Sequence, residues 1–244
     1  MSQTFDIIVV GGGSAGSVLA GRLSDDPNIR VLLLEAGPDD DNVLIRMPKG
    51  NGKMLSDPNY CHYFPTDYNK QWPGARDEVW IRGKVMGGSS AINGMVYHRG
   101  QPEDYDRFVE LGLKHWGWSD ILASFLQLEN HELAPTAWRG QGGPIDIRMQ
   151  PTRTRLSEAM MVAAKGMGLP IKEEPNLPRQ EGISYMAHNI NARGERVSAS
   201  GAFLTPEVRR RLNLRIEVNH ATLSGHSFAI PRVTIAMDFP FRTS

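Results

Sequence analysis

The sequence predicts an α/β fold, and three features near its N-terminus support that prediction. The apolar segment Phe5–Val10 is rich in β-branched residues and ends at three glycines, which is typical of a buried parallel strand. A helix is predicted next, because the apolar side chains of Ser14–Leu23 fall on one helical face. A second apolar strand, Val31–Leu34, then completes a βαβ unit of about 30 residues, the usual size.

The remaining elements are less regular. Residues 38–80 are rich in Pro, Asn, Asp, Tyr and Trp without a sustained period, so we predict a long, partly ordered excursion. Further helices are predicted at Glu103–Leu113, Ser119–Glu129, Leu156–Met167 and Ala199–Arg211, the last interrupted by Pro206. Further strands are predicted at Ile145–Arg148, Tyr185–Asn191 and Asn213–Leu223.

Composition excludes several classes of protein. The chain has 27 Lys and Arg against 27 Asp and Glu, so its zero net charge argues against nucleic acid or an anionic membrane as a partner. No segment approaches the roughly 18 apolar residues of a membrane span. A single cysteine, Cys61, rules out an internal disulfide, and the N-terminus lacks a secretory pattern. We therefore predict a cytoplasmic protein, and we predict no metal site.

The first chemical motif is Gly11-x-Gly13-x-x-Gly16, which lies between the first strand and the first helix. Gly11 permits a tight turn, Gly13 lets the backbone approach a pyrophosphate, and Gly16 lets the helix and strand pack closely. The helix N-terminus offers unpaired N–H groups to phosphate charge. Glu35 ends the next strand and can accept hydrogen bonds from an adenosine ribose, while repelling a 2′-phosphate. Together these residues predict a Rossmann-like FAD/NAD(P)-binding domain that disfavours NADP.

A competing interpretation uses the same residues. Gly12-x-Ser14-x-Gly16 also matches the nucleophile elbow of α/β hydrolases. In that fold the elbow follows several strands, whereas here it follows the first. A hydrolase would also need a downstream histidine, and nothing around His188, His220 or His226 marks one as catalytic. A serine hydrolase using Ser14 is therefore the less favoured alternative.

The second motif is the glycine- and serine-rich segment Arg82–Tyr97, in which small residues allow a backbone to lie against a ligand. It resembles the first signature of the glucose–methanol–choline (GMC) flavoprotein oxidoreductases, in their choline dehydrogenase-like branch. The resemblance covers roughly residues 4–223 and recurs at Arg99-Gly100, Asp104-Tyr105, Gly142–Pro144, Gln180–Gly182 and Arg196–Ala199.

The resemblance implies a noncovalently bound FAD and oxidation of a small alcohol by hydride transfer to the flavin. It implies that Glu35 holds the ribose and that the pyrophosphate is held by Gly11, Gly13, Ser14, Ala15 and Gly16. The residues implied along the pyrophosphate and isoalloxazine are Gly87, Gly88, Ser89, Asn93, Gly94, Met95 and Val96. Some relatives attach the flavin through a histidine just before the asparagine; that position is Ile92 here, which argues against a covalent link.

The resemblance also implies a division into domains. We expect an incomplete FAD-binding domain at residues 1–150 and 196–223, and part of a second, α+β substrate domain at residues 151–195. Residues 224–244 match nothing expected from the family, and our hypothesis for them is a reading-frame change or a premature end after about Leu223.

The family's catalytic histidine belongs near the C-terminus of a considerably longer chain. We therefore expect an N-terminal portion of such an enzyme, and we assign no catalytic residue. A noncatalytic FAD-binding fragment is the alternative. The particular alcohol and the electron acceptor, oxygen or a quinone-like carrier, stay open.

Overall fold

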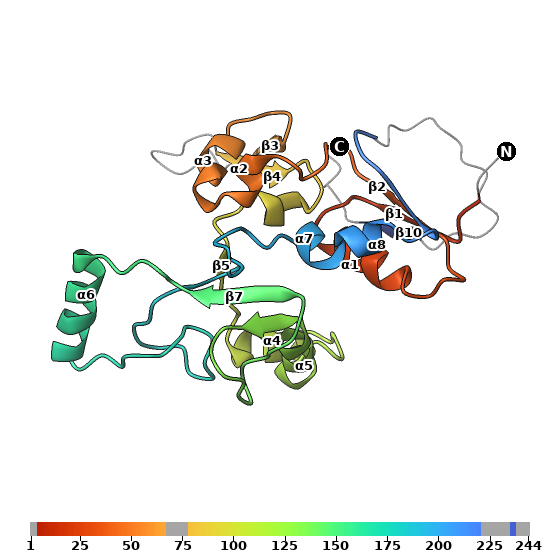
Figure 1. Ribbon diagram of the computed structural model, residues 1–244. Helices are drawn as coiled ribbons and strands as arrows, with labels where there is room; N and C mark the ends of the chain where they lie inside the picture. The colour runs from red at the N-terminus through yellow and green to blue at the C-terminus, as the bar shows by residue number, and fades with distance from the viewer. Residues whose placement is uncertain (1–3, 67–77, 221–234, 238–244) are drawn as a thin grey trace. The chain divides into compact units, whose positions relative to one another are not determined.

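The computed structural model describes residues 4–66, 78–220 and 235–237, the last as backbone only. The chain forms two compact units, and most of their elements are labelled in Figure 1. The first unit contains residues 1–94 and 198–244, and the second contains residues 95–197. The predicted domain limit near residue 150 thus lies within the second unit.

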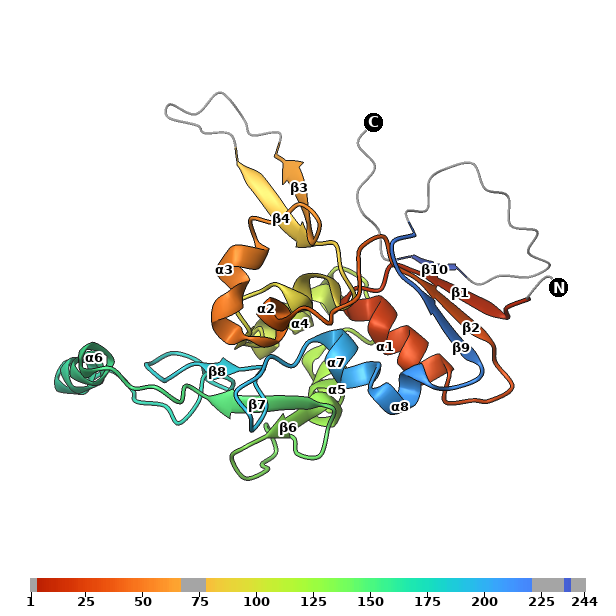
Figure 2. The same ribbon diagram turned by 45° about the horizontal axis from the view of Figure 1, so that its top comes forward.

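A parallel four-stranded sheet, in the order β10-β1-β2-β9, forms the centre of the first unit (Figure 2). Its strands are β1 (Ile7–Val10), β2 (Val31–Leu34), β9 (Leu214–Glu217) and β10 (Ile235–Met237). The helix α1 (Ser14–Leu23) connects β1 to β2, so the predicted βαβ unit is confirmed. Strand β10 lies after residue 223, in the segment for which the sequence analysis found no family resemblance, and it pairs with β1.

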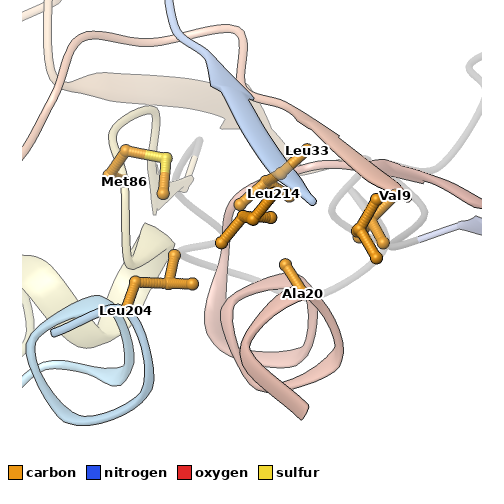
Figure 3. Close-up of a cluster of buried hydrophobic side chains, with 7 residues drawn as sticks. Val9, Ala20, Leu33, Met86, Leu204 and Leu214 are labelled. Atoms are coloured by element: carbon orange, nitrogen blue, oxygen red, sulfur yellow. The ribbon is translucent and has the colours of Figure 1, made fainter. Parts of the chain in front are cut away.

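Apolar side chains from the sheet and its helices form the core of this unit (Figure 3). Val9, Leu33 and Leu214 come from three neighbouring strands and are buried against Ala20 of α1. The second helix of this layer is α7 (Ala199–Phe203), which packs closely on α1. A Cβ at Gly21 of α1 would lie 2.5 Å from the Phe203 carbonyl oxygen, so a glycine is needed where the two helices meet.

The predicted excursion at residues 38–80 is more ordered than expected. It contains the short helices α2 (Val43–Arg46), η1 (Pro48–Gly50) and α3 (Asn51–Met54), followed by an antiparallel pair, β3 (Cys61–Pro65) and β4 (Val79–Gly83). Residues 67–77 of this excursion lie outside the described residues. A second apolar cluster supports this part of the unit, with Ile45, Met54, Cys61, Val85, Ala91 and Ile92 buried.

Proline divides the predicted helix at residues 199–211 as expected. Helix α7 ends at Phe203, and α8 (Pro206–Arg209) begins at Pro206. Pro206 takes the first position of α8, where its missing N–H leaves no internal hydrogen bond unmade.

The second unit has its own sheet, in the order β5-β8-β7-β6. The strands are β5 (Val96–Tyr97), β8 (Ala187–His188), β7 (Ile145–Met149) and β6 (Glu129–His131), and the helices are α4 (Pro102–Glu110), α5 (Trp118–Leu128) and α6 (Arg155–Gly166). The strand predicted at Tyr185–Asn191 is reduced to the two residues of β8. The helices predicted at residues 103–113, 119–129 and 156–167 are confirmed within three residues at each end.

Buried charges lie at the centre of the second unit. The Glu129 carboxylate accepts hydrogen bonds from Arg99, from the Tyr97 hydroxyl at 2.5 Å and from the Gly140 amide at 2.8 Å. His131 is only 2% exposed, and its Nδ1 accepts from the Leu133 amide at 3.1 Å. Burial, aided by the charge of Arg139, lowers the pKa of His131 to about 4, so this imidazole is neutral near pH 7.

No helix within the described part of the chain is long and apolar enough to cross a membrane.

Candidate functional site

The first glycine loop turns directly from β1 into α1. Gly11 adopts a φ of +94°, a left-handed conformation that favours glycine, and its amide donates to the Leu34 carbonyl at 2.8 Å. A Cβ at Gly16 would lie 1.8 Å from the Gly11 carbonyl oxygen, so any side chain there would displace the turn. Both glycines therefore meet the structural need predicted from the motif.

The N-terminus of α1 is suited to an anion. Gly13 is its N-cap residue, in an extended conformation, and Ser14 and Ala15 are exposed at its first turn. Across residues 4–66 and 78–220, no protein acceptor takes the amide hydrogens of Ser14, Ala15 and Gly16. Unpaired amides at the positive end of a helix dipole are the groups that hold a pyrophosphate.

Glu35 lies at the carboxyl end of β2, beside the same loop. Its side chain is buried, with Oε2 accepting from the Gly12 amide at 2.7 Å and Oε1 accepting from the Gly37 amide at 2.8 Å. These two charge-assisted bonds hold the carboxylate at the carboxyl end of β2, beside the first glycine loop. The structure thus places Glu35 beside the glycine motif, and its role toward an adenosine ribose stays a prediction.

The second glycine loop packs on the first. The Gly87 amide donates to the Gly12 carbonyl at 2.7 Å, and a Cβ at Gly88 would lie 2.7 Å from the Gly13 Cα. Both Gly87 and Gly88 have positive φ values, +85° and +55°. The Gly87–Gly88 backbone, which carries no side chains, therefore lies beside the N-terminus of α1. A pyrophosphate needs such a surface, because a side chain there would block its approach.

The other predicted residues of this loop have varied environments. The Ser89 hydroxyl accepts from the Gly83 amide at 3.1 Å, so it supports the end of β4. Asn93 and Gly94 are exposed at the end of the first unit. Met95 and Val96 begin the second unit, where Met95 is buried with a φ of +61° and Val96 is half exposed in β5. The first unit thus brings together the residues around α1 and Glu35, whereas Met95 and Val96 belong to the second unit, with Val96 in its sheet.

A hollow of about 300 Å³ lies next to Glu35 along the carboxyl ends of the parallel strands. Its walls include Gly37 after β2 and Asn219 after β9, together with Tyr60 and Lys84. Asn219 has a left-handed φ of +59°, and its amide donates to the Gly37 carbonyl at 2.8 Å. The sequence analysis missed these residues and placed Asn219 inside the strand predicted at Asn213–Leu223, whereas β9 ends at Glu217. Asparagine tolerates a left-handed conformation, and this is the signal that could have marked an earlier end to that strand.

The hydrolase alternative gains no support from the geometry. Within the described residues, no histidine lies at hydrogen-bond distance from Ser14, which starts α1. The His220 imidazole lies 3.3 Å from Glu217, and His188 belongs to β8 of the second unit. The third candidate, His226, lies outside the described residues.

The parallel sheet, the two glycine loops and the acid at the end of β2 define a dinucleotide-binding α/β protein. This chain belongs to the GMC oxidoreductase family, because the model of that family matches residues 5–223. The matched range agrees with the extent of the resemblance in the sequence. FAD is the cofactor of this family.

Relatives of known function share this region. The chain is 41% identical over 223 residues to the mitochondrial choline dehydrogenase of Mus musculus, covering 88% of this chain and 37% of that protein. It is 38% identical over 205 residues to the oxygen-dependent choline dehydrogenase of Sinorhizobium medicae, covering 84% of this chain and 37% of that protein. It therefore spans 37% of the length of these curated relatives.

Solved structures share the fold. The pyridoxine 4-oxidase from Mesorbium loti matches with a TM-score of 0.82 at 37% identity, covering 88% of this chain and 42% of that one. A formate oxidase matches with a TM-score of 0.75 at 26% identity, covering 89% of this chain and 39% of that one.

Proposed function

We propose that this chain forms the FAD-binding part of an oxidoreductase that oxidises a small alcohol, with hydride passing to a noncovalently bound flavin. The observation that carries the proposal is the contact between the two glycine loops, where Gly88 lies against Gly13 beside the free amides of α1. Ile92, at the position where some relatives attach the flavin, is buried and has no group that could form such a link. When bound, FAD supplies the hydride acceptor.

The residues divide the task of holding FAD. The amides of Ser14, Ala15 and Gly16 bind the pyrophosphate, and the side-chain-free surface of the second loop allows it to approach. Glu35 accepts from the ribose hydroxyls. We assign the adenine to the hollow lined by Ala36, Gly37 and Asn219, because its wall begins at the residue after Glu35.

The substrate class follows from the relatives, since the choline dehydrogenases and the pyridoxine 4-oxidase are named for substrates that carry an alcohol. We assign no catalytic base to this chain, and the electron acceptor stays open. We retain a cytoplasmic location as a proposal, based on the single cysteine.

Flavin loading followed by anaerobic addition of alcohols tests the proposal. The purified 244-residue chain is incubated with FAD and desalted, and its visible spectrum is then recorded before and after choline, an aliphatic alcohol or an aromatic alcohol is added. Bleaching of the bound flavin supports the oxidoreductase function. Bound flavin that stays oxidised with every alcohol identifies a noncatalytic FAD-binding fragment instead.

An esterase assay addresses the remaining alternative. Hydrolysis of p-nitrophenyl esters that disappears in Ser14→Ala would favour the serine hydrolase. We expect no such activity, because no histidine in the described regions is placed to activate Ser14.

A further inference from the structure

The start of α7 packs against Gly87 of the second glycine loop. A Cβ at Gly87 would lie 2.7 Å from the Ser200 Oγ and 3.4 Å from the Ser198 Cβ. Ser200 is completely buried. Gly87 therefore lies between the Gly12 carbonyl, to which its amide donates, and the hydroxyl of Ser200.

Hydrogen bonds connect the loop to the start of α7. The Ser90 hydroxyl donates to the Gly87 carbonyl at 2.5 Å and accepts from the Ala199 amide at 2.9 Å. The Ser198 hydroxyl caps α7 by accepting from the Gly201 amide at 3.1 Å. Any displacement of α7 would therefore move the second loop with it.

An aspartate from the segment after β2 holds Ser200 in turn. The Ser200 hydroxyl donates to Oδ2 of Asp40, whose other oxygen accepts from Arg209 Nη2 at 2.8 Å. The same segment approaches the loop a second time, because the Pro38 carbonyl accepts from the Met86 amide at 3.0 Å. Residues 38–40 thus hold the second loop directly at Met86, and they support Gly87 through Ser200.

Arg209 of α8 fixes the aspartate. Its Nη1 donates to both oxygens of Asp39 at 2.8 and 2.9 Å, and its Nε donates to the Leu204 carbonyl at 2.9 Å. A guanidinium provides these donors in one rigid plane, which a lysine cannot reproduce. Burial raises the pKa of Asp40, opposed by the bond from Ser200 and the charge of Arg209, so the carboxylate depends on these two partners.

We propose that Asp40, held by Arg209, is a positioning residue for the cofactor site: through Ser200 it keeps Gly87 and Gly88 against the first glycine loop and thereby sets the affinity for the pyrophosphate of FAD. This inference rests on the proposed function. Asp40 acts on the cofactor through Ser200 and the loop, so its effect is on affinity and not on the identity of the ligand.

The test compares FAD affinity with folding stability in the full chain. The dissociation constant for FAD is measured by flavin fluorescence titration for the wild type, Asp40→Asn, Ser200→Ala and the double variant, and the free energy of unfolding of each apo chain is measured with denaturant. The matched control is Asp6→Asn, because Asp6 also pairs with an arginine, Arg30, in the first unit and bonds to neither glycine loop.

We expect each single variant to weaken FAD binding at least tenfold and the double variant to be no weaker than the weaker single, since both changes break one chain of contacts. Asp6→Asn should bind like the wild type. Affinities within twofold of the wild type for both single variants would overturn the inference, as would losses that merely track unfolding free energy across all variants, Asp6→Asn included. If Asp40→Asn does not fold, Ser200→Ala decides by the same thresholds. A wild-type chain that binds no FAD would instead refute the proposed function itself.

Discussion

Replacing Gly88 by alanine is the most direct perturbation of the contact between the two glycine loops. The new Cβ would lie 2.7 Å from the Gly13 Cα, well inside the roughly 3.5–4.0 Å at which carbon atoms make favourable contact. Gly88 also has a φ of +55°, a conformation that costs an alanine about 1–2 kcal/mol. Overpacking against a backbone atom adds about 1–3 kcal/mol.

The two costs together amount to about 2–5 kcal/mol. In the free chain the loop relieves them by moving away from Gly13, so FAD binding must restore the strained contact that forms the pyrophosphate surface. At the lower end this predicts about a 30-fold weaker affinity for FAD, since about 1.4 kcal/mol corresponds to a factor of ten. The affinity is measured by equilibrium titration with FAD, and the fold of the apo variant is checked by circular dichroism and thermal unfolding.

Gly52→Ala provides the matched control. A Cβ at Gly52 of α3 would have no atom within 4 Å, and the φ angle of Gly52 is not positive. This variant should therefore bind FAD like the wild type. It should also be slightly more stable, because alanine is the better helix former. A Gly88→Ala variant that is folded and binds FAD with wild-type affinity would refute the account of the loop contact.

Three further predictions follow from buried groups. Glu35→Gln should weaken FAD binding about tenfold, as measured by calorimetry with FAD. The glutamine NH2 group would face one of the two backbone N–H groups that now donate to Glu35, and leaving that N–H without an acceptor costs about 1–3 kcal/mol. The pKa of His131 is about 4 in the folded chain and near 6.5 in the unfolded chain, so the unfolded chain binds a proton first as the pH falls. The free energy of unfolding should therefore decrease by about 3 kcal/mol in all between pH 6.5 and pH 4. Denaturant curves should show this pH dependence in the wild type and lose it in His131→Asn; equal slopes would contradict it. Burial raises the pKa of the Cys61 thiol, so Ellman's reagent should label the native chain slowly and the denatured chain at once.

The elements that the sequence predicted well are those determined by local pattern. β1, α1 and β2 follow from apolar residues with clear periods and from the glycines that end the first strand. The break between α7 and α8 follows from the properties of Pro206 alone. Glu35 was identified by its distance from the glycine motif, and the structure confirms that it lies beside that motif.

The elements that the sequence missed depend on pairing between distant residues. Strands β3 and β4 form an antiparallel pair in a region whose polar and aromatic residues show no period, so the excursion concealed them. Strand β8 contains only Ala187 and His188, the two residues that pair with both β5 and β7, and this pairing between distant segments is not visible in a local pattern. The packing of Gly88 on Gly13 joins residues 75 apart in the chain, and only the folded structure reveals it.

The central claim is that the first unit holds FAD between the glycine loops and Glu35. The most direct test is the flavin-to-protein ratio of the 244-residue chain after it has been loaded with FAD and desalted. The account predicts a retained flavin spectrum at about one FAD per chain. The Gly88→Ala chain should retain much less FAD after the same desalting step. A chain that is folded by circular dichroism and retains no flavin would contradict it.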